Sequence, residues 1–395
     1  MTASNEPSRI AEAARRFTEL FGGAPEFIVR APGRVNLIGE HTDYNDGFVF
    51  PAAIDRDVLI AGSARADQQV RAVALNFNQS STFPLENVQA AGEGREKWSN
   101  YLRAMAWVFH KEGLGTRGMN CVTLGNVPLG AGLSSSAALL VASGLAFSAV
   151  AGLEIEPVRL ALLAQKGERE FVGVNVGIMD QYISALGQKD HALLIDTRSL
   201  TYEAVPLPRT GVAIVIADTN KKRGLVDSEY NTRRSECERA VEILKAFLPD
   251  IKALRDVSVE QFNTYQDKLP EVTRRRAKHV VTEDQRTLES VEVLKAGDVA
   301  RFGVLMNESH ESLRVDYEVS CRELDALVEA ARSVEGVYGA RMTGAGFGGC
   351  TVSLVRSDAV ETFQSEVAER YKKATGLNTT IYVTTASQGA QRLQW

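Results

Sequence analysis

The segment from Pro128 to Leu140, Pro-Leu-Gly-Ala-Gly-Leu-Ser-Ser-Ser-Ala-Ala-Leu-Leu, is the feature that most constrains the fold of this chain. Its first part, residues 128–136 (the Gly/Ser loop), is rich in glycine and serine, and an alanine-rich apolar run follows to about Leu153. Residues 119–124 have the pattern of a strand, so we expect the order strand, loop, helix. Glycines let backbone N–H groups approach an anion closely, and a helix N-terminus adds about half a positive charge. This order predicts a phosphate-binding loop, with an ordinary serine-capped helix start as the alternative.

Residues 34–46 (the polar segment) have a second unusual composition. They follow Pro32-Gly33, a dipeptide that predicts a turn. Acidic, basic, imidazole, amide and phenol side chains lie close together there, with apolar residues between them. A plain surface loop rarely has this mixture, whereas binding sites gather convergent polar groups, so we expect a ligand to bind here. The polar residues are Arg34, Asn36, Glu40, His41, Asp43, Tyr44 and Asp46.

Helical and strand patterns alternate along the rest of the chain without the regular rhythm of parallel βαβ units, which predicts an α+β fold. The helices of the second half are rich in Glu, Lys and Arg, which predicts solvent-exposed outer faces. Prolines and glycine at 206–211 predict a boundary between domains 1–207 and 208–395. The expected helices are 8–21, 96–112, 157–170, 229–247, 271–296, 298–314, 320–333 and 358–374. The expected strands, besides 119–124, are 26–30, 48–54, 58–64, 70–77, 191–196, 212–217, 337–342, 350–355 and 379–384.

Charge and cysteine content limit the expected partners and location. The net charge is −5, with basic residues spread among acidic ones, which argues against a nucleic acid or an acidic membrane surface as a partner. The longest apolar run, 137–153, is shorter than a typical membrane span and is interrupted by polar residues. The four cysteines lie far apart, and residues 1–7 lack the pattern of a secretory signal. We therefore expect a cytoplasmic protein without disulfides, as a monomer or weak oligomer.

Some nucleotide-binding patterns occur only as literal matches. G-x-G-x-x-G is present at 113–118 and 344–349, but each match precedes a strand rather than a helix, which argues against a dinucleotide fold. The Walker pattern G-x-x-x-x-G-K-[ST] is absent, and the five histidines do not cluster as in a transition-metal centre. What remains is the Gly/Ser loop, the polar segment, an isolated acid in a glycine-containing turn (Asp180) and a second glycine-rich hairpin at 343–349. Phosphoryl transfer from ATP needs such a set of parts.

These segments together resemble the galactokinases of the GHMP small-molecule kinase family. Residues 33–45, Gly-Arg-Val-Asn-Leu-Ile-Gly-Glu-His-Thr-Asp-Tyr-Asn, are similar to the family's sugar signature, 128–138 to its ATP motif, and 342–349 to its C-terminal glycine motif. Residues 177–181 and 228–237 also fit. The resemblance implies a two-lobed α+β fold with the active site in the cleft between the lobes. It also implies that ATP phosphorylates α-D-galactose at the anomeric hydroxyl, which gives galactose 1-phosphate and ADP.

The resemblance also assigns roles to individual residues. Asp180 would lie next to the anomeric hydroxyl as a base or as the group that orients it, and Arg34 would lie close to Asp180 and the transferring phosphoryl group. The sugar-binding residues would be Glu40, His41, Asp43, Gly177, Asp180 and Tyr230. The ATP-binding residues would be Gly130, Gly132, Leu133, Ser134, Ser135 and Ser136, with Trp98 and Tyr101 beside the adenine. Ser135 and Glu168 would hold Mg²⁺.

Simpler explanations exist for several of these residues. Asp180 fits a helix cap, Arg34 a surface ion pair, Tyr230 a core aromatic and Glu168 an exposed helix residue, while the spacing of Trp98 and Tyr101 also fits core packing.

Two other functions compete with galactose phosphorylation. A related kinase for N-acetylgalactosamine would need room beside the second hydroxyl of the sugar. A non-catalytic regulator that binds galactose and ATP would be expected to lose part of residues 132–136 or Asp180, and this chain keeps both.

Overall fold

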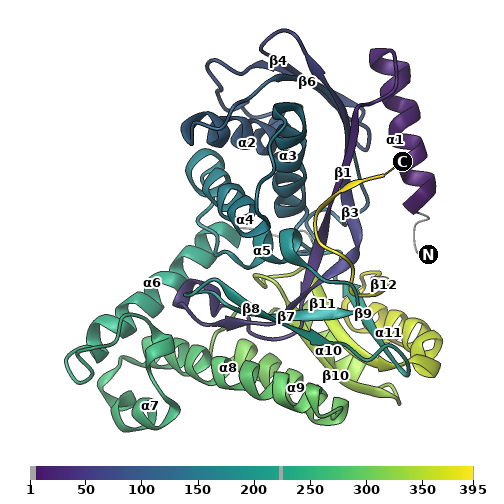
Figure 1. The fold of residues 1–395 in the computed structure, drawn as a ribbon. Helices are drawn as coiled ribbons and strands as arrows, with labels where there is room; N and C mark the ends of the chain where they lie inside the picture. The colour runs from purple at the N-terminus through teal and green to yellow at the C-terminus, as the bar shows by residue number, and fades with distance from the viewer. Residues whose placement is uncertain (1–5, 222–225, 395) are drawn as a thin grey trace.

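The computed structural model describes residues 6–221 and 226–394 and has two lobes, one above the other in Figure 1. Residues 1–5, which are part of the segment used to argue against a secretory signal, lie outside the described residues. The first half of the chain forms α1 (Glu6–Phe21), β1 (Phe27–Asn36), β2 (Phe48–Val49), β3 (Pro51–Arg65), β4 (Gln69–Ala74), β5 (Gln79–Pro84), α2 (Asn100–Lys111), β6 (Gly118–Gly125), α3 (Ser135–Ala151), α4 (Pro157–Lys166), α5 (Met179–Leu186), β7 (His191–Asp196) and β8 (Thr201–Pro206). The second half forms β9 (Val212–Asp218), α6 (Val226–Leu244), α7 (Val259–Tyr265), α8 (Glu271–Lys295), α9 (Val299–Val315), α10 (Arg322–Arg332), β10 (Val337–Thr343), β11 (Cys350–Arg356), α11 (Val360–Thr375), β12 (Thr380–Thr384) and β13 (Gln391–Leu393).

The strands of the described residues form three sheets. A six-stranded sheet of order β13-β1-β3-β6-β4-β5 forms the upper lobe, and a four-stranded sheet of order β10-β11-β9-β12 lies in the lower lobe. The short sheet β2-β7-β8 lies where the lobes meet, because β7 packs against β3 and β8 against α8. Within residues 6–221 and 226–394, only β4 and β6 pair in parallel. The mainly antiparallel sheets and separate helical layers confirm the α+β fold.

The two faces of the upper sheet bury different sets of residues. Side chains alternate along a strand, so Ile28 of β1 packs with Phe17 of α1, whereas Phe27 and Val29 face the opposite core. In Figure 1, α1 covers one face of the sheet and α2 to α5 lie on the other. This second face positions the start of α3 and the start of α5 beside β1.

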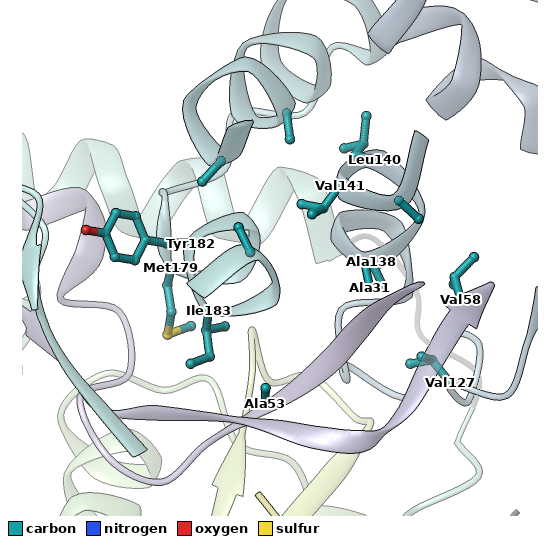
Figure 2. Close-up of a cluster of buried hydrophobic side chains, with 14 of the residues drawn as sticks. Ala31, Ala53, Val58, Val127, Ala138, Leu140, Val141, Met179, Tyr182 and Ile183 are labelled. Atoms are coloured by element: carbon teal, nitrogen blue, oxygen red, sulfur yellow. The ribbon is translucent and has the colours of Figure 1, made fainter. Parts of the chain in front are cut away.

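A buried apolar cluster fixes α3 and α5 against the strands. Figure 2 shows side chains from α3, α5, β1 and β3 in one group, and all of them belong to the main core of the protein. Nearly every residue of α3 from Ala137 to Val150 is apolar or small, so the helix is buried on most of its surface. Among the residues in this cluster are Ala31, Ala53, Val58, Ala138, Val141, Met179 and Ile183.

The strand predictions near the polar segment are wrong in their bounds. Pro32-Gly33 forms no turn but lies inside β1, which continues to Asn36 with a shift of register between Pro32 and Arg34. Such an irregularity tolerates a proline that cannot donate to the ladder. The expected strands 48–54 and 58–64 are mostly one strand, β3. The charged residues 55–57, between the two expected strands, are typical of a loop. Asp57 is buried, however, and forms an ion pair with Arg9 at 2.6 Å.

Other local predictions also need correction. Asp180 lies in the first turn of α5 rather than in a glycine-containing turn. The helix expected at 157–170 ends at Lys166 and continues as a π-helical turn, Gly167–Val172. The strand expected at 70–77 ends at Ala74. Short elements without a strong pattern were missed, namely β5, β8, α5, α7 and β13.

The end of the chain returns to the first lobe. β13, drawn in yellow beside β1 in Figure 1, pairs with β1 from Ile28 opposite Leu393 to Arg30 opposite Gln391. The boundary between residues 207 and 208 stays a prediction.

Two expectations about the whole chain can also be compared with the structure. The four cysteines are free thiols, as expected. No helix in the described part of the chain combines the length and apolar character needed to cross a membrane.

Candidate active site

The Gly/Ser loop is fixed directly to the end of β1. The backbone N–H of Arg34 donates to the Leu133 carbonyl at 3.1 Å, and Nη1 of Arg34 donates to the Gly132 carbonyl at 2.5 Å. A Cβ on Gly33 would lie 2.6 Å from the Leu133 carbonyl oxygen, so glycine is needed for this close approach. The loop that follows β6 and the polar segment that begins in β1 therefore meet at Arg34.

Asp180, in the first turn of α5, is the centre of the site. Its carboxylate accepts hydrogen bonds from Arg34, from Nε at 2.8 Å and from Nη2 at 2.9 Å. The hydroxyl of Ser134 donates to Oδ2 of Asp180 at 2.5 Å. The Asp180 side chain is 28% exposed, whereas the Arg34 side chain is 6% exposed. A buried, bidentate guanidinium thus holds a carboxylate that remains accessible to a ligand.

Asp43, in the 3₁₀ turn that follows β1, lies against Gly177. A Cβ built on Gly177 would lie 1.7 Å from Oδ2 of Asp43, so a larger residue would displace the carboxylate. Burial and the charges of Asp180 and Glu40 raise the pKa of Asp43 to about 7. The carboxyl groups of Asp43, Asp180 and Glu40 therefore lie close enough for their charges to interact, and such a group of acceptors suits a ligand with several hydroxyl donors.

Tyr230 of α6 comes from the other lobe and reaches the same region. Its ring centroid lies 5.8 Å from that of His41 and 5.0 Å from that of Tyr44. Burial and the charge of Asp43 raise the pKa of Tyr230 well above its usual value, so its phenol stays protonated. The structure therefore places Tyr230 with the polar segment rather than in a separate aromatic core.

Glu40 joins the polar segment to the C-terminal glycine motif. The backbone N–H of Gly344 donates to both carboxylate oxygens, at 3.0 and 3.2 Å. Burial raises the pKa of Glu40 although Arg341, 3.7 Å away, acts in the opposite direction. A Cβ on Gly344 would lie 3.1 Å from the Gly132 carbonyl oxygen. The hairpin between β10 and β11 is therefore in contact with both the polar segment and the Gly/Ser loop.

Sequence reasoning missed two buried residues of α8 that form hydrogen bonds to the backbone of the polar segment. Oε1 of Glu283 accepts from the backbone N–H groups of Gly39 at 3.0 Å and Glu40 at 3.3 Å. Nε2 of His279, one turn earlier, donates to the Glu40 carbonyl at 3.0 Å. The dense charges of residues 271–296 predicted an exposed face, but this face of α8 is buried. The apolar pair Val280-Val281 beside His279 is the one local signal that could have shown it.

A cavity of about 320 Å³ lies beside the Gly/Ser loop. Trp98 and Tyr101 line it, together with Ser135 and Ser136 at the start of α3. Nε1 of Trp98 is buried and has no hydrogen-bond partner among the described residues. Of the residues expected to bind ATP, these four therefore share one cavity, whereas Gly132, Leu133 and Ser134 contact β1 and Asp180.

Glu168 lies in the π-helical turn and is 4% exposed, so it is no surface residue. Its Oε2 accepts from Nε2 of Gln181 at 2.5 Å. A carboxylate and the Ser135 hydroxyl are both oxygen ligands, which is the donor type that Mg²⁺ prefers, and phosphate oxygens and water usually complete its shell. The residue types therefore fit that ion. Among the residues that the structure describes, no three His, Cys, Asp or Glu side chains gather as a metal cluster.

Comparison with known proteins identifies the family. A model of the galactokinase galactose-binding signature matches residues 15–64, and models of the N-terminal and C-terminal GHMP kinase domains match 100–188 and 290–373. The chain is 51% identical over 382 residues to a galactokinase of Roseiflexus sp. (strain RS-1), and the match covers 97% of each chain. The chain belongs to the galactokinase family.

Solved structures agree with membership of the galactokinase family. The galactokinase of Lactococcus lactis complexed with galactose has a TM-score of 0.93 and 38% identity, and the match covers 98% of this chain and 100% of that one. The mevalonate kinase of Methanococcus jannaschii has a TM-score of 0.63 and 19% identity, with 93% and 99% coverage, which shows a shared fold alone. The expected family and the two-lobed GHMP kinase fold are confirmed. The roles of individual residues stay predictions.

Proposed function

We propose that this chain transfers the γ-phosphoryl group of ATP to the anomeric hydroxyl of α-D-galactose, which gives galactose 1-phosphate and ADP. The position of Asp180 carries the proposal: its accessible carboxylate is held by Arg34 and Ser134 at the end of the Gly/Ser loop. A carboxylate that can accept a hydrogen bond from a hydroxyl group, a cation and the proposed phosphate-binding loop thus lie next to one another. The match to the galactose-binding signature and the 51% identical galactokinase support galactose as the acceptor.

In this reaction Asp180 accepts a hydrogen bond from the anomeric hydroxyl, either as its base or as the group that orients it. The hydroxyl oxygen forms a bond to the γ-phosphorus as the bond to ADP breaks, and the hydroxyl proton passes to Asp180 when Asp180 is the base or to a phosphate oxygen when Asp180 only orients the hydroxyl. Arg34 is the cation nearest to the charge that spreads over the phosphoryl oxygens. Because Arg34 is already bonded to Asp180 and to the Gly132 carbonyl, it needs little reorganisation when the substrates bind.

The sugar is proposed to bind in the region bounded by the polar segment, α5 and α6. Its hydroxyl groups would bond to the side chains of Glu40, His41 and Asp43. The backbone of Gly177 and the phenol of Tyr230 would complete the pocket. The support is geometric, because Gly177 lies against the Asp43 carboxylate and the ring of Tyr230 lies 5.8 Å from that of His41.

ATP is proposed to bind with its phosphates on the Gly/Ser loop. Mg²⁺ would be held by Ser135 and Glu168, and when bound it would reduce the negative charge of the β- and γ-phosphates. The cavity of about 320 Å³ supports an adenine position beside Trp98 and Tyr101. The loop residues in contact with phosphate would be Gly130, Gly132, Leu133, Ser134, Ser135 and Ser136.

We also infer a cytoplasmic location and a monomer or weak oligomer, with the chain divided into domains 1–207 and 208–395. The free thiols support a reducing compartment.

Release of ADP with a panel of sugars tests the proposed reaction. We expect Mg²⁺-dependent turnover with galactose, little with glucose, and much less with N-acetylgalactosamine, and we expect a chelator to abolish it. A preference for N-acetylgalactosamine would point to the related kinase. Calorimetric binding of galactose and ATP without turnover would point to a regulator.

Replacement of Asp180 by asparagine tests the residue that carries the proposal. Asp180→Asn keeps the shape of the side chain but removes its charge, so kcat should fall by about a thousandfold. Asp190→Asn is the matched control, because Asp190 pairs with the exposed Arg209 at 3.3 Å. Near-normal turnover by Asp180→Asn would remove its assigned role.

A further inference from the structure

A buried hydrogen bond joins the turn that carries Glu168 to the helix that carries Asp180. Nε2 of Gln181, the residue after Asp180, donates to Oε2 of Glu168 at 2.5 Å. Gln181 is 0% exposed and Glu168 is 4% exposed, so the bond is shielded from water. Gln181 lies in α5, whereas Glu168 lies in the π-helical turn after α4. The bond therefore fixes the Glu168 carboxylate relative to the first turn of α5.

The same bond connects Glu168 to the Gly/Ser loop. Oδ2 of Asp180 accepts from the hydroxyl of Ser134, and Ser134 directly precedes Ser135 at the start of α3. Two hydrogen bonds and two peptide bonds thus connect the two residues proposed to hold Mg²⁺, Ser135 and Glu168. Gln181 is the one member of this series to which the proposed reaction gives no role.

The direction of the bond between Gln181 and Glu168 follows from the chemistry of the two groups. A carboxylate that binds a metal ion is ionised, and an ionised carboxylate only accepts hydrogen bonds. The amide of Gln181 can donate only through Nε2. A rotated amide would place Oε1 against the carboxylate, acceptor against acceptor. Gln181 therefore restrains Glu168 in a way that requires no proton on the carboxylate.

The other end of the Gln181 amide also suits a metal site. Oε1 is buried and has no hydrogen-bond partner among the described residues. A buried acceptor without a donor is unfavourable. Mg²⁺ usually keeps several of its waters when it binds to a protein, and these waters are donors. An acceptor at this place, next to a proposed ligand, is therefore of the type that supports a hydrated ion.

We propose that Gln181 is a positioning residue that holds the Glu168 carboxylate in place for Mg²⁺. Gln181 then acts through Glu168 and does not contact the sugar. The inference rests on the proposed function, which places Mg²⁺ at Ser135 and Glu168. Because Gln181 follows Asp180 directly, the helical turn that presents the proposed catalytic carboxylate also orients a proposed metal ligand.

The contribution of the ion to ATP binding tests this role without any turnover. Calorimetry without sugar gives the ATP affinity of each protein with Mg²⁺ and with a chelator, and the ratio of the two affinities measures what the ion contributes. Gln181→Met keeps about the length of the side chain but removes both polar atoms, so the ratio should fall by about tenfold. The ATP affinity in chelator and the galactose affinity should change by less than about twofold. An unchanged ratio, or an equal loss of affinity with and without Mg²⁺, overturns the proposal.

Two further variants separate this role from general damage to the core. Gln165→Met is the matched control, because Nε2 of Gln165 in α4 donates to the Val176 carbonyl at 3.4 Å and not to Glu168. It should keep the native ratio, and a loss equal to that of Gln181→Met overturns the proposal. Gln181→Asn keeps a buried amide that is one methylene shorter, so the ratio should fall as in Gln181→Met. This variant decides the question if Gln181→Met does not fold, and a native ratio in it overturns the proposal.

A double substitution tests whether Gln181 acts through Glu168. Glu168→Gln should lower the same ratio, because it removes the charge of a proposed ligand. Addition of Gln181→Met to Glu168→Gln should lower the ratio by less than about threefold more. The proposal is overturned by an equal effect of Gln181→Met in both backgrounds, or by a native ratio in Glu168→Gln. If the ratios behave as expected but galactose is not phosphorylated, the proposed function fails while the role of Gln181 at the metal stands.

Discussion

The Gly/Ser loop and the polar segment meet at Arg34, but different parts of the chain hold them. The loop takes its shape from neighbours in sequence and from hydrogen bonds that the backbone and the side chain of Arg34 in β1 donate to it. The residues that line the cavity beside it all lie between Val58 and Leu139. The polar segment is held by side chains from α8, by the β10–β11 hairpin and by tyrosines near α6 and α9. The proposed nucleotide side is therefore built mostly from one part of the chain, whereas the proposed sugar side is held by side chains from several distant elements. Single side-chain changes should be tolerated better on the nucleotide side.

Among the variants that compare the two sides, the largest effect is expected from Gly177→Ala on the sugar side. The added Cβ would lie 1.7 Å from Oδ2 of Asp43, so the Asp43 carboxylate would have to move away from its position in the site. We expect kcat/KM for galactose to fall by at least about a hundredfold, while calorimetric binding of ATP stays within about twofold.

Gly115→Ala is its matched control, because a Cβ on Gly115 meets no atom within 4 Å. Equal loss of ATP and galactose binding in Gly177→Ala would show that the two sides are not separable.

Ser134→Ala tests the point where the two sides join. It removes the hydroxyl that donates to Asp180, a hydrogen bond to a charged group. We expect kcat to fall by about ten- to a hundredfold, with a smaller change in the KM values.

Ser143→Ala, in the helix α3 that follows Ser134, removes a buried hydroxyl that donates to the Leu139 carbonyl and should leave kcat unchanged. A Ser134→Ala enzyme that loses only ATP affinity would assign the hydroxyl to the nucleotide instead of Asp180.

Glu283→Gln weakens the hydrogen bonds by which α8 holds the polar segment on the sugar side. It replaces charge-assisted hydrogen bonds to the backbone of Gly39 and Glu40 by neutral ones. We expect the KM for galactose to rise by about five- to twentyfold, the KM for ATP to stay within about twofold, and the free energy of unfolding to fall by about 1 to 3 kcal/mol.

The pH dependence of stability gives a further check on Glu283. Burial alone would raise its pKa, but the charges of Arg286 and His279 outweigh burial and lower it to about 2. The native carboxylate therefore stabilises the fold above its unfolded pKa of about 4.5, and this contribution is lost as the pH falls toward 2. The stability difference between native protein and Glu283→Gln should shrink over that range. Glu292→Gln, on the exposed face of α8, should show no such change.

The smallest effect is expected from Trp98→Phe on the nucleotide side. The indole N–H has no hydrogen-bond partner in the described protein, and phenylalanine keeps an aromatic face in the cavity. We expect the KM for ATP to rise by about threefold or less, with no change for galactose. A rise of more than about thirtyfold would mean that the N–H binds the nucleotide and that this side also depends on single polar groups.

Local pattern predicted the strand, loop and helix around residues 119–153, because glycine, serine and an apolar run act through neighbours in the chain. It also predicted most helices and the polar residues of the site. It failed where long-range contacts override local preference. The charges within β3 suggested a loop, but burial and an ion pair to α1 keep the strand continuous. The acids of α8 suggested an exposed face, but Glu283 accepts from the backbone N–H of Gly39, and Asp284 accepts from that of Phe48.

The sequence by itself determined the family and the chemical types of the candidate site residues, and it predicted a phosphate-binding loop, because these depend on residue identity and short spacing. Only the tertiary structure decided that Ser134 bonds to Asp180 together with Arg34, that Gly177 lies against Asp43, and that α8 holds the backbone of Glu40. These contacts join residues from different elements and, for α8, from different lobes. Burial gives them their strength by removing competing water, and no local pattern encodes which buried groups will meet.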